Sequence, residues 1–181
     1  MVKSMYMSKN KDIEKLLEKV KKVTAQKELD LSSGEDLSIG IMNLISIEEH
    51  LFYTSQKTGD KKYLDLINEI RSMRTELMKE IIKDYEGEVW CISKHLLAAS
   101  MRLMEVGTKE LKKGNKEKAW GLFDKSYKLY SLFWGLNLGV VETKDLPAEA
   151  SIKQNGESKI QYSVFSKLGA LVQKAVDCCK E

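Results

Sequence analysis

The side chains of this chain best suited to metal or nucleophilic chemistry are its 2 histidines and 3 cysteines. Cys91 and His95 are separated by one helical turn, a spacing that puts two potential ligands on the same face of a helix. Glu88 and His50 could complete a metal site with them. The paired Glu-x-x-His motif of di-metal helical bundles is absent, however. The sequence therefore favours boundary residues at these positions, with the metal site as an alternative.

Catalytic motifs are missing from the printed sequence. It contains no Gly-rich phosphate loop, no Ser-His-Asp ordering and no Cys-x-x-Cys pair. With so few candidates for acid–base chemistry, we expect no catalytic residues, no cofactor and a non-enzymatic protein.

Two charged residues occupy positions where helical periodicity expects apolar ones. At about 100° per residue, Glu48 lies near the centre of an apolar arc and Arg74 lies within the apolar arc of the next predicted helix. A carboxylate in such a place is costly unless it is paired. We therefore predict a buried Glu48–Arg74 ion pair. It could determine helix register, or it could form part of a polar ligand pocket.

Aromatic residues are concentrated in one later segment. Phe123, Tyr127, Tyr130 and Trp134 recur at steps of four, three and four residues, so they share one face of a helix. Core packing explains most of such a stripe. Any part that stays exposed would be a surface for a partner helix or peptide.

The elements that must position these residues are all predicted to be helical. Proline occurs once, and apolar residues recur at three- and four-residue steps along most of the chain. The expected helices span about 8–26, 36–57, 61–84, 88–112, 116–138 and 158–181. Short turns at Gly59, Gly87 and Gly114 separate the middle four, so sequential neighbours should be antiparallel.

The predicted fold is thus all-α: an antiparallel helical bundle of four core helices, about 36–138, with an additional N-terminal and C-terminal helix. Along the chain we expect an N-terminal amphipathic helix within 1–30, the bundle core at 31–138, a linker at 139–157 and the C-terminal helix at 158–181. The apolar stripe of the last helix must be buried, either on this bundle or on a second chain.

Part of the core resembles a known repeat family. Gly107, Gly114, Ala119 and Phe123 have the offsets that a tetratricopeptide repeat uses for its glycines, its small packing residue and its aromatic residue. Residues 98–130 therefore resemble a single tetratricopeptide-like helical hairpin. Glu110 stands where that family usually has tyrosine. The resemblance implies a hairpin whose helices approach closely, and a role in protein–protein interaction.

The amino-acid composition argues against several classes of protein. The chain is 43% apolar and 31% charged with net charge +3, which is ordinary for a soluble fold and short of the strong positive footprint of a dedicated nucleic-acid binder. Its apolar runs are too short to span a bilayer, and its first residues lack a secretory signal. The odd number of cysteines suggests no disulfide framework, which favours the cytoplasm.

Our leading hypothesis is a helical protein-interaction module that binds a protein partner or forms a homo-oligomer. The alternative is a bundle that binds a small molecule or metal around Glu48 and Arg74. A second alternative is weak RNA association through the lysine-rich first helix, since residues 1–28 carry eight lysines and four acidic residues.

Overall fold

The computed structural model describes residues 32–83 and 87–141 of the 181-residue chain, together with six positions nearer its ends: 18, 19, 22, 168, 169 and 172. Four long α-helices and no strand occur in the described residues. The all-helical prediction is confirmed. The described positions of both terminal segments are helical too, while the rest of 1–30, 142–157 and most of 158–181 lie outside the described residues.

The first pair of helices is joined at a glycine turn. Helices α2 (Ser32–Thr58) and α3 (Lys62–Ile81) are separated by three residues. Gly59 has φ of +70°, a left-handed conformation that a side chain would strain, and its N–H donates to the Ser55 carbonyl at 2.8 Å. Asp60 then accepts a hydrogen bond from the Lys62 N–H at 3.0 Å, which satisfies a free donor at the start of α3.

The second pair is α4 (Glu88–Lys112) and α5 (Lys116–Asn137), joined at Gly114. Small residues let these helices pack closely. A Cβ added at Gly107 would lie 2.6 Å from the Phe123 ring. The hydroxyls of Ser100 and Ser126 each donate to the other residue's carbonyl, at 2.9 and 2.7 Å. The close approach that the glycine and aromatic spacing implied is therefore present in this hairpin.

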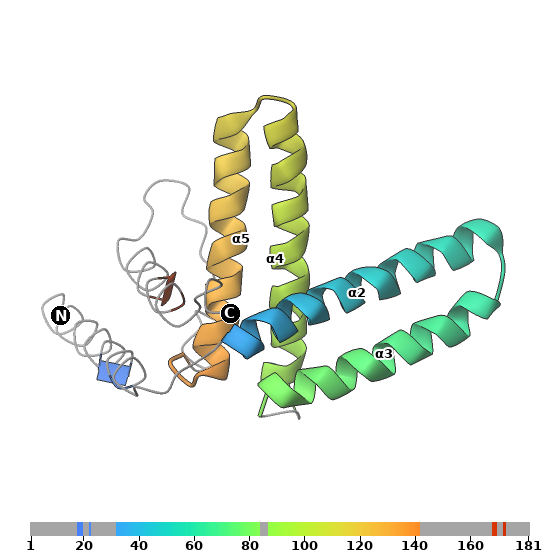
Figure 1. Cartoon of the computed structure of the whole chain (residues 1–181), viewed down its shortest axis with the longest axis horizontal. Helices are drawn as coiled ribbons and strands as arrows, with labels where there is room; N and C mark the ends of the chain where they lie inside the picture. The colour runs from blue at the N-terminus through green and yellow to red at the C-terminus, as the bar shows by residue number, and fades with distance from the viewer. Residues whose placement is uncertain are drawn as a thin grey trace, which may run out of the picture.

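The helices are arranged as two hairpins that meet at one end (Figure 1). The α4–α5 hairpin and the α2–α3 hairpin point in different directions, and α2 contacts α4 over part of its length. This differs from four helices packed along their whole length. Short turns determine which helices are neighbours, whereas packing at the junction determines the angle between the hairpins.

The core lies where the hairpins meet. Its fully buried members come from α2, α3, α4, α5 and the C-terminal segment: Ile41, Met78, Leu97, Phe133 and Leu168. A Cβ at Gly135 of α5 would lie 2.9 Å from Leu168, so the leucine fills the space that this glycine leaves. The described positions of the last helix therefore pack against α5 of the same chain.

Candidate functional site

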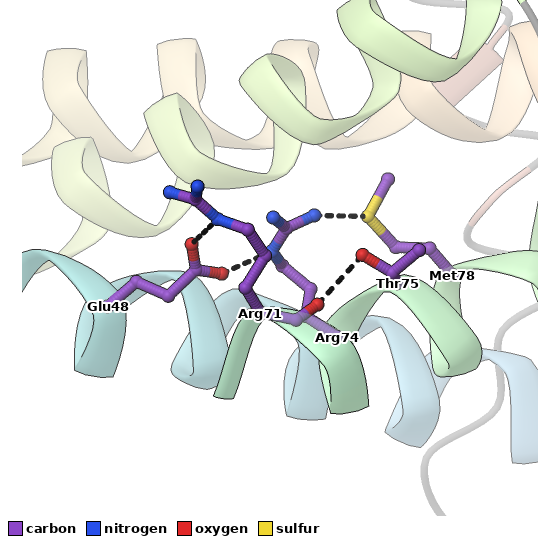
Figure 2. A network of polar contacts seen from close by, with 5 residues as sticks. All are labelled: Glu48, Arg71, Arg74, Thr75 and Met78. Carbon is purple, nitrogen blue, oxygen red and sulfur yellow. Dashed lines mark hydrogen bonds and ion pairs between the residues drawn. The ribbon is translucent and has the colours of Figure 1, made fainter. Parts of the chain in front are cut away.

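Glu48 and Arg74, the predicted pair, are brought together between α2 and α3 (Figure 2). The Arg74 Nε donates to one carboxylate oxygen of Glu48, and the Arg71 Nε donates to the other at 3.1 Å. The side chains of Glu48 and Arg74 are 12% and 7% exposed. The Arg74 Nη1 also donates to the Met78 sulfur at 3.3 Å. Two guanidinium groups thus compensate one nearly buried carboxylate.

Arg71 is the member of this cluster that sequence reasoning missed. It lies three residues before Arg74, hence on a neighbouring part of the same helix face, and that spacing was the available signal. Its side chain is largely exposed, so it reaches Glu48 from the edge of the hairpin. Since both carboxylate oxygens are engaged within the chain, the cluster favours a role in helix register over a ligand pocket.

The aromatic stripe of α5 is used mostly within the chain. Trp134 is buried, and its ring lies 3.1 Å from where a Cβ at Gly34 of α2 would be. The Tyr130 hydroxyl shares a 2.8 Å hydrogen bond with Ser38 of α2. These contacts join the two hairpins, so this part of the stripe is not a free surface for a partner.

The other two aromatic residues also have partners within the chain. Phe123 packs against Gly107, and the Tyr127 hydroxyl donates to the Gly169 carbonyl at 2.8 Å. Burial raises the pKa of both the Tyr127 and Tyr130 phenols, since an ionised phenolate would lose hydration there. Among the four predicted aromatics, Tyr127 keeps the most exposed ring. The prediction of a partner-binding aromatic face therefore finds little open surface.

The residues suggested as metal ligands are not brought together. Glu88, Cys91, His95 and His50 are all exposed. Within the described part of the chain, no group of three or more His, Cys, Asp or Glu side chains could hold a metal ion. The one-turn spacing of Cys91 and His95 placed them on one helix face, but no other helix adds ligands to that face.

A second carboxylate cluster, which the sequence did not predict, lies at the α4–α5 turn. The Glu110 carboxylate accepts hydrogen bonds from Lys113 Nζ and Asn115 Nδ2, both at 2.9 Å, and forms an ion pair with Lys118 at 3.1 Å. These donors, Lys113 first, lower the pKa of Glu110 to about 2. The available sequence signal was the acidic Glu110 within a segment of otherwise basic and apolar residues before the Gly114 turn. This cluster holds the turn together.

The α2–α3 hairpin has one side that faces α4. Successive residues of a helix are rotated by about 100° around its axis. Glu48 of α2 points at α3, and on this wheel Met42 and Glu49 both lie on the same side of Glu48. Glu49 forms an ion pair with Arg102 of α4, and Met42 is buried, so this side faces the second hairpin.

The opposite side of this hairpin is apolar and partly exposed. Glu48 and Arg74 face each other across the hairpin. Because α2 and α3 are antiparallel, residues of α2 and α3 that have the same angular offset from Glu48 and from Arg74, respectively, lie on the same surface of the hairpin. We call this surface the outer face; its members are Leu44, Ile47, Leu51, Leu66, Ile70, Met73 and Leu77. Ile47, Leu66 and Met73 are 41%, 42% and 46% exposed, and the other four are half-buried. Leu77, at the junction end of this face, also packs against the core. Periodicity alone does not identify this face, because Leu44, Ile70 and Leu77 belong to the same apolar arcs as the residues buried between the helices.

No protein-family model, curated protein sequence or solved structure matches this chain significantly. The tetratricopeptide-like resemblance of residues 98–130 therefore stays a prediction. Among the described residues, no helix has both the length and the apolar content needed to cross a bilayer.

Proposed function

We propose that this protein is a non-enzymatic helical interaction module that binds another protein through the outer face of its α2–α3 hairpin. The observation that carries the proposal is that seven apolar residues share one side of this hairpin and that three of them, Ile47, Leu66 and Met73, are more than 40% exposed. Exposed apolar residues that gather on one surface, and are not scattered singly, are typical of a binding site. Burying it against a partner would remove apolar area from water at about 25 cal/mol per Å².

The alternatives have less support from the described residues. A ligand site at Glu48 and Arg74 would compete with contacts that already engage both carboxylate oxygens. The lysine-rich segment suggested for RNA association lies almost wholly outside the described residues, which leaves RNA binding a prediction. Self-association through the outer face is a variant of the leading proposal, with the same surface and a different occupant.

The chain offers closely matched controls for a test. Ile47 on the outer face and Ile39, on the side of α2 turned away from α3, are 41% and 43% exposed. Met73 on the outer face and Met104 on α4 are each 46% exposed. The double variants Ile47→Asp/Met73→Asp and Ile39→Asp/Met104→Asp therefore introduce the same charges at positions of nearly equal exposure.

Both variants and the parent would be used to capture proteins and small molecules from an extract of the native cells, with quantitative mass spectrometry. We expect the parent and the Ile39/Met104 variant to recover the same protein in similar amounts. The Ile47/Met73 variant should recover at least tenfold less of that protein. Circular dichroism checks that both variants are folded. Equal recovery by all three, or no protein above background with the parent, would contradict the proposal.

A further inference from the structure

The outer face is bordered on its α3 side by a row of acidic residues. Glu69, Glu76 and Glu80 are separated by seven and four residues, so they lie along one edge of α3, beside Met73. All three glutamates are exposed. Lys62, at the turn end of this edge, pairs with Asp60 at 2.9 Å. Glu76 also accepts a 3.5 Å hydrogen bond from the Ser72 hydroxyl. Three exposed carboxylates therefore lie along this edge, next to an apolar surface.

The dimensions of the surface suit one helix. The apolar members on α3 run from Leu66 to Leu77 and the acidic edge runs from Glu69 to Glu80. At 1.5 Å per residue each extends about 17 Å, or roughly three helical turns. Two adjacent antiparallel helices present a shallow depression between them that a third helix can fill with residues at three- and four-residue steps. An extended strand would need a sheet edge, and the described residues contain no strand.

From this we propose that the occupant of the outer face is an amphipathic α-helix of a partner protein, with an apolar stripe against α2 and α3 and a row of Lys or Arg beside Glu69, Glu76 and Glu80. This inference rests on the proposed function and specifies the chemistry of the partner. Opposite charges at the rim of an apolar contact raise the association rate and determine orientation, while the apolar residues supply most of the affinity.

Charge also argues against a second copy of this chain as the occupant. In a two-fold symmetric contact the outer face would meet itself, so its acidic edge would need basic residues on the same surface. The outer face contains none, and the α2 edge carries the acidic Asp36, the uncharged Asn43 and Thr54, and one imidazole, that of the exposed His50, against three glutamates on the α3 edge. A heterologous basic helix satisfies the three glutamates, whereas a copy of the same face does not.

Photo-cross-linking in the 181-residue chain tests the inference. Benzoylphenylalanine replaces Ile47 in one version and the matched Ile39 in another, and the proteins are irradiated in native-cell extract. Mass spectrometry then identifies the peptide joined at each position. We expect position 47 to capture a peptide with apolar residues at three- and four-residue steps and Lys or Arg along one edge, and position 39 to capture it at least fivefold less.

Charge reversal provides the second readout. Glu69→Lys/Glu76→Lys/Glu80→Lys should lower the yield at position 47 at least fivefold. The control Glu88→Lys/Glu117→Lys/Asp124→Lys makes the same change in net charge on α4 and α5, away from the outer face, and should leave the yield within twofold.

The outcomes separate the two proposals. No cross-linked protein at position 47 would contradict the proposed function itself. A cross-link to a second copy of this chain, to an acidic or non-helical segment, or one that survives the charge reversal, would overturn the inference and leave an interaction module of another specificity.

Discussion

Glu48 is held by two arginines of unequal exposure, and the consequences for stability depend mainly on the buried one. Arg74 is almost wholly buried, whereas Arg71 is largely exposed and can return to water at little cost. An ion pair in such a place stabilises a fold less than its geometry suggests, because both charges were desolvated to form it. Removing one partner is much more harmful, since the other charge then stays buried.

Arg74→Leu should therefore destabilise the chain by about 3 kcal/mol, because Glu48 keeps only the exposed Arg71. The double variant Glu48→Met/Arg74→Leu should recover most of that loss, since neither buried charge remains. Urea denaturation of the parent, the single variant and the double variant measures both effects. A single variant as stable as the parent would contradict the account of the pair.

Glu110 predicts a pH dependence of stability. Its pKa is lowered from 4.5 to about 2 in the folded chain, so it contributes stability that is fully present above pH 4.5 and is lost as the pH falls towards 2. Glu110→Gln should therefore lower the melting temperature at pH 7, and the difference from the parent should shrink across that acidic range. Thermal unfolding followed from pH 7 to pH 2 checks this; a difference that stays constant with pH would refute it.

At the scale of the helices, sequence periodicity predicted far more than it missed. The expected spans at 88–112 and 116–138 agree with α4 and α5 within one residue, and Gly59, Gly87 and Gly114 all have positive φ. These features are local: glycine marks a turn and apolar spacing marks a helix. The Glu48–Arg74 contact was also predictable, since a three-residue turn determines the register of an antiparallel pair.

The angle between the hairpins and the outer face were not predictable in this way. The angle depends on contacts such as Gly34 with Trp134 and Glu49 with Arg102, which join residues about 50 to 100 positions apart. Which side of α2–α3 stays exposed follows from that angle. The metal-site and aromatic-surface hypotheses could not be decided from the sequence for the same reason. Each depends on which helix packs against the proposed ligands or aromatic residues.

The Gly107–Phe123 contact can be tested at this scale. Replacing a helical glycine by alanine normally stabilises a protein by about 1 kcal/mol. Gly107→Ala should instead destabilise by about 1–3 kcal/mol, because its Cβ would overlap the Phe123 ring. The control Gly121→Ala, at a helical glycine with nothing within 4 Å of the added Cβ, should be neutral or stabilising. Stabilisation by both substitutions would show that the helices can move apart freely.

For the whole molecule, the position of the core predicts an uneven distribution of local stability. The most buried residues lie where the hairpins meet, and the Gly59 turn is at the far end of α2–α3 (Figure 1). Amides far from buried apolar contacts exchange through local opening, whereas core amides require more extensive unfolding.

Hydrogen exchange should show this gradient directly. We expect amides in the second half of α2 and the first half of α3 to exchange at least tenfold faster than those around Leu97 of α4. Binding of the partner to the outer face should slow exchange in α2 and α3 more than in α5. Uniform protection along all four helices would contradict a core confined to the junction.

Leu168 and Val172 also belong to that core, although they come more than 25 residues after the last residue of α5. During synthesis the α2–α5 hairpins emerge first, with the hollow at Gly135 and the ring of Tyr127 still uncovered. The nascent chain therefore carries an exposed apolar surface until residues 168–172 have also emerged, and chaperones or aggregation compete with folding during this interval.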